Sequence, residues 1–202
     1  MTHTEVILTL QRRLCDGLKS MGGQLLQTTD KDVCDLTLND FYQMFWDDDN
    51  IIVMDCKASV GMGFSDLDSY VLSEFGIPAW AAPNFEFSQP KLVRYGFIGF
   101  GEDRYDRQVL YSANDRLVFV ENGSDRLAIS VGIDGLVFFL VAYAMMVECA
   151  ISSDRCAAIN NRIPMDLIFA FESIYKNEYG YLYDGSFVEE EVGRLRYSGS
   201  EA

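Results

Sequence analysis

Histidine is nearly missing from this chain. Its 202 residues include one histidine, His3, close to the N-terminus. Serine and cysteine nucleophiles, HExxH zinc sites and most acid–base catalysis need an imidazole held in a packed site. Because chain ends are commonly mobile, we expect His3 to be an exposed terminal residue. The near-absence of histidine therefore argues against these classes of enzyme.

Basic residues are also scarce. Sixteen Lys and Arg stand against thirty-one Asp and Glu, which gives a formal net charge of -15. Such a charge repels phosphate backbones and anionic lipid, so we expect neither a nucleic-acid nor a membrane partner. Two interpretations of the acidity stay open: it keeps the protein soluble, or it attracts a basic protein partner.

Paired cysteines and a membrane-length apolar run are missing too. No CxxC occurs among the five cysteines, which are Cys15, Cys34, Cys56, Cys149 and Cys156. The N-terminal segment carries Glu5, Arg12 and Arg13 instead of the apolar run of a signal peptide, so we expect reduced thiols in the cytoplasm. The most apolar stretch, 135–147, is shorter than the ~20 residues that span a bilayer, and it predicts a buried helix.

Several segments have the apolar spacing of an amphipathic helix. They run from Ile7 to Met21 with an end near Gly22-Gly23, from Leu38 to Phe45, from Leu67 to Phe75, from Gly135 to about Ala150, and from Pro164 to Glu178. Ser65 is the expected N-cap of the third helix, with Asp68 at the capping-box position, and Asp134 the expected cap of the fourth. The tail from about Tyr179 predicts a strand or an extended arm.

The middle of the chain has the pattern of short strands. They cover 84–88, 93–101, 107–112, 116–121 and 126–130, and Asn122-Gly123 favours a tight hairpin between the last two. Consecutive strands joined by such turns are antiparallel neighbours. The predicted fold class is therefore α+β, with an antiparallel meander flanked by N-terminal and C-terminal helices.

Two glycine-rich stretches could be mistaken for phosphate-binding loops. In the first, Gly96–Gly101, the glycines are followed by Glu102 and Asp103, whose charge would repel a pyrophosphate. In the second, 61–66, Asp66 and Asp68 already occupy the anion-binding end of the next helix. We interpret the first stretch as a bulge or close backbone approach followed by an exposed turn.

Runs of acidic residues raise the possibility of a metal site. Asp47, Asp48 and Asp49, with Asp55, could gather a hard cation, and a metal-dependent hydrolase is therefore a rival interpretation. Three successive side chains point in different directions, however, and the run lacks the alternate spacing of a calcium loop. A solvated acidic face is the favoured interpretation here and for Glu189–Glu191. The sequence predicts no metal site and no cofactor.

The order of elements from 69 to 151 resembles the SUKH superfamily of immunity proteins, especially its fourth subfamily. Gly76-Ile77-Pro78 corresponds to that family's turn after a helix, and Ile98-Gly99 to its strand step. The motif that opens the next helix corresponds to Ser130, Ile133, Leu136, Phe139 and Leu140. On this resemblance, 1–202 is a single SUKH-like domain, with a C-terminal helix and tail at 160–202.

The resemblance implies a non-enzymatic protein that blocks a toxin from a competing bacterium, often a nuclease or deaminase. Such toxins tend to be basic, so an acidic inhibitor would be attracted to them. A regulatory or scaffold domain without a toxin partner is the alternative. The expected partner contacts are acidic and aromatic residues on turns: Asp47, Asp48, Asp49, Trp80, Glu102, Asp103, Tyr105 and Asp106.

Overall fold

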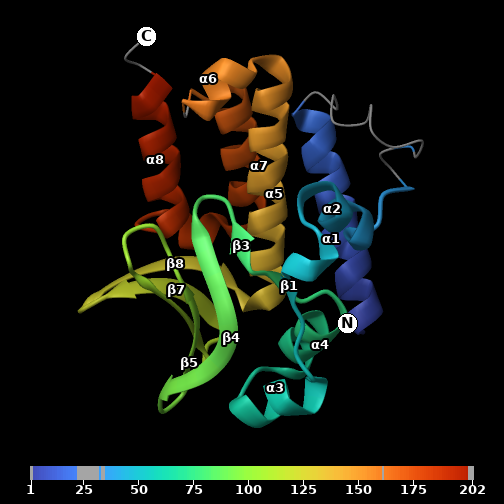
Figure 1. Cartoon of the computed structure of the whole chain (residues 1–202), viewed down its shortest axis with the longest axis vertical. Coiled ribbons are helices and arrows are strands. Elements are labelled where there is room, and N and C mark those ends of the chain that lie inside the picture. Colours follow the sequence, from blue (N-terminus) through green and yellow to red (C-terminus); the bar gives the residue numbers. More distant parts are fainter. Residues whose placement is uncertain (1, 22–31, 33–34, 161, 200–202) are drawn as a thin grey trace.

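The chain folds into a group of upright helices beside a curled antiparallel sheet (Figure 1). The computed structural model describes residues 2–21, 32, 35–160 and 162–199. The helices are α1 (His3–Ser20), α2 (Leu38–Phe45), the 3₁₀ turn η3 (Asp48–Asn50), α3 (Cys56–Met62), α4 (Asp66–Glu74), α5 (Gly132–Ser153), α6 (Arg155–Ile159), α7 (Met165–Tyr183) and α8 (Phe187–Gly199). The predicted α+β class is confirmed.

The strands follow one another across the sheet. They are β1 (Ile51–Ile52), β2 (Ile77–Pro78), β3 (Trp80–Ala81), β4 (Phe85–Arg94), β5 (Phe97–Glu102), β6 (Gln108–Ser112), β7 (Leu117–Asn122) and β8 (Asp125–Val131). The main sheet has the order β3-β4-β5-β6-β7-β8, with every neighbouring pair antiparallel, and β1 pairs separately with β2. The meander is therefore confirmed.

The glycine-rich stretch turns the chain and then lets two strands approach closely. The expected continuous strand 93–101 is wrong, because Gly96, at φ +75°, lies in the turn between β4 and β5. Within β5, a Cβ on Gly99 would lie 2.6 Å from Val93, and one on Gly101 would lie 2.6 Å from a carbonyl oxygen of β4. The register shifts between these two glycines, as the bulge interpretation predicts.

The β7–β8 hairpin turns one residue later than expected. Asn122 pairs with Asp125, so the two-residue loop is Gly123-Ser124 and not Asn122-Gly123. Gly123 takes φ +63°, which glycine adopts without a steric penalty. The expected hairpin is present.

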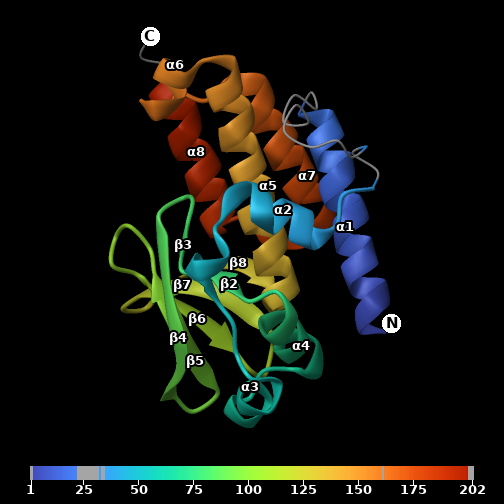
Figure 2. The ribbon, with the colours of Figure 1, turned by 45° about the vertical axis from the view of Figure 1, so that its right-hand side comes forward.

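Helix α5 runs through the middle of the helical group, and in Figure 2 it stands between α1 and α8. It begins at Gly132 rather than Gly135 and is long and apolar enough to cross a membrane, although 72% of its most apolar window is buried inside the protein. The expected capping by Asp134 is wrong. Its carboxylate binds the Arg116 guanidinium instead, at 3.1 Å.

The C-terminal segment is helical, so the expected strand or arm from Tyr179 is wrong. α7 continues to Tyr183, and α8 follows a turn at Gly185, where φ is +72°. α8 buries Phe187, Val188, Val192 and Leu195, and those contacts favour a helix over an exposed arm. The expected solvated face at Glu189–Glu191 is wrong for Glu191, which is 1% exposed.

The early helices follow their capping residues. In α1 the Thr2 hydroxyl and the Glu5 side chain form a capping box, and α2 ends at Phe45, ahead of the acidic run, as predicted. The Ser65 hydroxyl caps α4 by accepting a hydrogen bond from the Asp68 amide. Gly22-Gly23 and Cys34 lie outside the described residues.

Asp68 connects α4 to the sheet and to α5 instead of completing a capping box. Its buried carboxylate accepts hydrogen bonds from the Tyr111 hydroxyl at 2.8 Å, from Nε and Nη2 of Arg116 at 2.9 and 2.8 Å, and from the Ile133 amide at 2.7 Å. Burial raises the pKa of Asp68, but the hydrogen bonds from Arg116 and Ser65 outweigh it, and the pKa lies below its usual value. This cluster joins three elements that are distant in the sequence.

Candidate functional site

Strand register places one tryptophan and two glutamates in a continuous row across the sheet. Trp80 pairs with Glu86, Glu86 with Glu102, and Glu102 with Gln108. Directly paired residues of antiparallel strands project from the same face. All four side chains are exposed, with Trp80 at 63%, whereas the alternate residues Phe85 and Phe87 are buried. We call Trp80, Glu86, Glu102 and Gln108 the sheet row.

The acidic run after α2 lies beside this row. The carbonyl of Asn50 accepts a hydrogen bond from the Ala79 amide at 2.6 Å, and Ile51 pairs with Pro78. Asp47, Asp48 and Asp49 are exposed, and none of their side chains makes a hydrogen bond or ion pair with a described residue. We call these three residues the acidic rim. The fold thus brings the rim close to Trp80, which is more than thirty residues away in the sequence.

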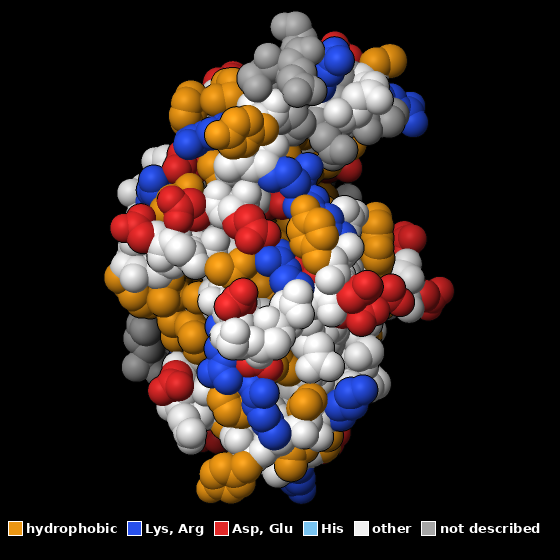
Figure 3. Space-filling view, turned by 90° about the vertical axis from the view of Figure 1, so that its left-hand side faces the viewer, with side chains coloured by type: hydrophobic (Ala, Val, Ile, Leu, Met, Phe, Trp, Pro, Cys, Tyr) orange, Lys and Arg blue, Asp and Glu red, His pale blue; other side chains and the backbone are white. Residues whose placement is uncertain are grey.

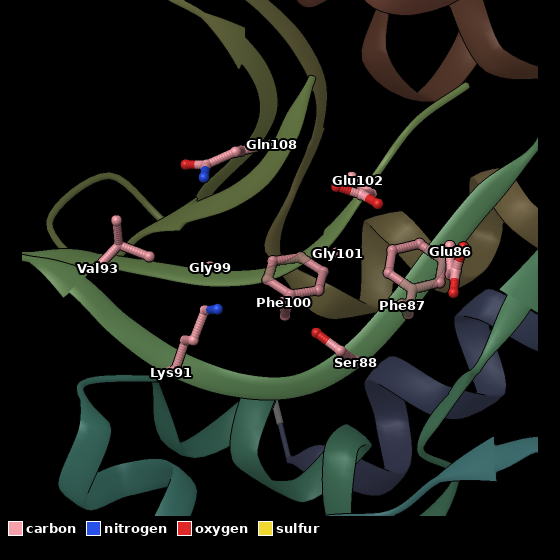
Figure 4. Close-up of a pocket in the computed structure, with 10 residues that line it drawn as sticks. All are labelled: Glu86, Phe87, Ser88, Lys91, Val93, Gly99, Phe100, Gly101, Glu102 and Gln108. Atoms are coloured by element: carbon pink, nitrogen blue, oxygen red, sulfur yellow. The ribbon is translucent and has the colours of Figure 1, made fainter. Parts of the chain in front are cut away.

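A groove of about 250 Å³ opens between β4 and β5 on the face that carries the sheet row. In Figure 4, Glu86 and Glu102 lie toward one end, and Lys91 and Val93 lie toward the other, with Gln108 above. The side chains of Glu86, Glu102, Lys91 and Gln108 make no hydrogen bond or ion pair with any residue that the structure describes. The groove therefore contains polar groups that are free to bind a ligand.

The turn between β5 and β6 displays only part of the expected contact set. Asp103 is 4% exposed, so its expected role as a surface contact is wrong. Its carboxylate holds the turn together by accepting hydrogen bonds from the amides of Tyr105 and Arg107 at 2.9 and 3.0 Å and from Arg107 Nε at 2.7 Å. Tyr105 is 54% exposed, and Asp106 is also exposed.

This turn is fastened to α8 by ion pairs. Arg104 binds Glu191 at 2.7 Å, and Arg107 binds Glu190 at 2.9 Å. Glu191 also accepts a hydrogen bond from the Tyr143 hydroxyl at 2.6 Å and pairs with Arg194. Burial raises the pKa of Glu191, but the hydrogen bonds from Arg194 and Tyr143 outweigh it, so the pKa lies below its usual value. The turn is thus held in one position next to the sheet.

The side of the molecule that carries α8 and the sheet hairpins is strongly mixed in charge. Figure 3 shows Asp and Glu side chains gathered across the middle of this side, with Lys and Arg above and below them. In the sheet and its turns, four arginines are bound to carboxylates of the protein: Arg94, Arg104, Arg107 and Arg126. The positive charges of these four arginines are therefore neutralised within the molecule.

The described residues contain no group of three or more His, Cys, Asp or Glu side chains arranged to hold a metal ion. Asp55, which the metal interpretation requires, caps α3 by accepting a hydrogen bond from the Ala58 amide at 2.9 Å. His3 begins α1, is exposed as expected, and stacks on Tyr70 at 4.8 Å between ring centroids.

The chain matches no protein-family model, no curated protein and no solved structure. The resemblance to the SUKH superfamily therefore stays a prediction, and the candidate site depends on the geometry of this chain alone.

The sequence prediction missed Glu86, Lys91 and Gln108. The alternation in Asn84–Ser88 indicates that Glu86 projects away from the core. Its place beside Glu102 depends on the pairing of β4 with β5, whose register shifts between Phe87 and Lys91. No pattern within one strand carries this information.

Proposed function

We propose that this protein is a non-enzymatic, acidic protein-binding domain that acts as an immunity protein. Its target would be a bacterial toxin of the nuclease or deaminase type. The observation that carries the proposal is the sheet row beside the acidic rim. There an exposed tryptophan pairs with Glu86, and the carboxylates of the row and the rim have no partners among the described residues.

This arrangement suits a basic partner for two physical reasons. Unpaired carboxylates on a chain of net charge -15 accelerate encounter with a cationic surface. An exposed tryptophan supplies the large apolar contact that commonly dominates binding energy at interfaces. A toxin that acts on nucleic acid needs a basic groove, and an acidic surface can occupy that groove in place of the substrate.

The fold supports the same proposal. The SUKH resemblance implies an antiparallel sheet flanked by helices, and this chain has that architecture. The β5–β6 turn presents Tyr105 and Asp106, two of the expected contact residues, to solvent. A protein interface built from these elements needs no catalytic residue.

The test is co-expression with the toxic protein encoded by the neighbouring gene. The wild-type chain should restore growth, and the double variant Trp80→Ala, Asp48→Lys should lose most of that protection. Asp16→Lys with Leu8→Ala is the matched control, because Asp16 and Leu8 are exposed on α1, away from the sheet. Loss of protection in the control alone, or in both variants equally, would argue against this surface as the interface.

A second measurement separates immunity from the rival functions. If the wild-type chain bound the neighbouring protein without restoring growth, a scaffold or regulatory role would be favoured. Calorimetric titration with Mg²⁺, Mn²⁺ and Ca²⁺ should give no saturable heat, and a clear isotherm would favour the metal-dependent hydrolase.

A further inference from the structure

The groove between β4 and β5 contains two carboxylates in an arrangement found nowhere else among the described residues. Glu86 and Glu102 are Cα partners, so two like charges face each other across neighbouring strands. Such opposed pairs destabilise a sheet. Elsewhere in the described chain the partly or fully buried carboxylates of the sheet and its junctions have cations: Glu121 binds Arg94 and Arg126, and Asp68 binds Arg116. No described cation pairs with Glu86 or Glu102.

The dimensions of the groove favour a side chain over a larger ligand. Its volume of about 250 Å³ lies below the ~300–1,000 Å³ of pockets that enclose drug-sized molecules. Val93, which is 43% exposed, contributes apolar wall against which an aliphatic stem can pack, and the carboxylates lie at the other end. Trp80 pairs with Glu86 next to this end and offers an exposed ring face.

We propose that this groove binds one arginine side chain presented by the protein partner. Glu86 and Glu102 would accept hydrogen bonds from the guanidinium, and Trp80 would contact its outer face. Arginine fits better than lysine because its planar donors can reach two carboxylates at once and stack on an aromatic ring. The inference deepens the proposed function, on which it rests, by naming the chemical group that the sheet row recognises.

Lys91 limits what the groove accepts. Its side chain lines the end away from the glutamates and has no described ion-pair partner. A second positive charge would be repelled there, so the groove takes a single basic side chain rather than a run of them. A phosphate would meet Glu86 and Glu102, which disfavours a nucleic-acid ligand.

The test uses the full chain and short capped peptides. The probe is N-acetyl-Gly-Arg-Gly-amide, compared with the peptides that carry lysine or citrulline in place of arginine. Amide shifts in two-dimensional NMR should change for β4 and β5 on adding the arginine peptide, with weaker saturation by lysine. Citrulline keeps the shape without the charge and should cause no saturable change.

Two variants connect the binding to the carboxylates. Glu86→Gln and Glu102→Gln should each weaken binding of the arginine peptide about tenfold, because a neutral amide replaces the carboxylate and the hydrogen bond to the guanidinium loses its ionic partner. Both side chains are exposed and each faces a like charge, so a melting temperature no lower than that of the wild type should show that the fold is kept. Asp16→Asn, on α1, is the control and should bind as the wild type does. Equal binding of citrulline, or unchanged binding in both glutamine variants, would overturn the proposal.

The groove proposal and the proposed function can fail separately. If the glutamine variants still protect against the toxin and the arginine peptide does not bind, the groove proposal is wrong while immunity stands. If the arginine peptide binds through both glutamates but no neighbouring toxin is neutralised, the groove proposal stands and immunity is wrong.

Discussion

Two groups of carboxylates in this protein differ in their exposure to solvent and in whether they have partners. One group is buried where helices meet the sheet, and its members Asp68 and Glu191 are 0% and 1% exposed. The other group, the acidic rim with Glu86 and Glu102, is exposed and has no described partners. Asp68 is matched by Arg116 and Glu191 by Arg194, so the charges of these buried acids are neutralised within the protein.

The buried carboxylates have a structural role, whereas the exposed carboxylates are available for recognition. A buried ion pair gains little over a packed apolar contact, but loss of one partner leaves an unpaired buried group. An exposed carboxylate contributes little to folding, and removal of it changes mainly encounters with other molecules. Substitution of a buried carboxylate should therefore lower the free energy of unfolding, and substitution of an exposed one should lower the rate of association with a partner.

The largest expected loss of stability follows substitution of a buried carboxylate. Asp68→Ala should lower the free energy of unfolding by about 3–5 kcal/mol, because Tyr111, Arg116 and the Ile133 amide all lose their acceptor. The measurement is urea unfolding followed by circular dichroism. Asp66→Ala, two residues away and exposed in the same helical turn, is the control and should cost about 0.3–1 kcal/mol. Equal losses would contradict a special role for the buried carboxylate.

A smaller loss is expected at the contact between the β5–β6 turn and α8. Glu191→Ala should cost about 1–3 kcal/mol, since the buried Tyr143 hydroxyl loses its acceptor and Arg104 loses its anchor. Hydrogen exchange at the Tyr105 amide should become faster than in the wild type. Glu190→Ala, whose side chain is 45% exposed, should cost less than about 1 kcal/mol. An unchanged exchange rate at the Tyr105 amide would mean that the contact with α8 does not hold the β5–β6 turn in place.

Much of the fold could be predicted from periodicity. The strands of the meander and the helices α1, α2, α4, α5 and α7 leave alternating or three-to-four spacing in the sequence, whereas the short helices α3 and α6 were not predicted. The C-terminal helix was missed although its apolar residues Val188, Val192 and Leu195 have the four-and-three spacing of a helical face. Their burial depends on contacts with distant elements, such as that of Phe187 with Phe85.

The candidate site was predictable only in part. The sequence marks Asp47–Asp49 and Trp80 as polar or aromatic residues on turns, and these are exposed. It could not distinguish Asp103 from Asp106, because a carboxylate that closes a turn and one that faces water have the same local pattern. It could not place Glu86 opposite Glu102, because register is a property of two strands.

Lowering the pH should destabilise the protein once the buried carboxylates become protonated. The pKa values of Asp68 and Glu191 are lower in the folded protein than in the unfolded chain, where they are about 4. The stability that each contributes is therefore complete above about pH 5 and is lost as the pH falls through the folded pKa. Urea unfolding at a series of pH values should show this loss below pH ~4.5. Glu191→Gln should flatten the slope, and an unchanged slope would contradict the linkage.

The smallest effect on stability should occur in the acidic rim. Replacing Asp47, Asp48 and Asp49 together by Asn should change the free energy of unfolding by less than about 0.5 kcal/mol, because the side chains have no described partners. Association with a basic toxin should nevertheless slow about tenfold at low salt, as measured by stopped-flow fluorescence.

The matched control for the rim removes the same charge elsewhere. Asp16, Asp166 and Asp184 are exposed on or beside α1 and α7, and their joint replacement by Asn changes the net charge equally. If recognition depends on the position of charge, this variant should associate at close to the wild-type rate. Equal slowing of both variants would mean that the net charge alone attracts the partner, and the exposed carboxylates would then have no role that depends on where the fold places them.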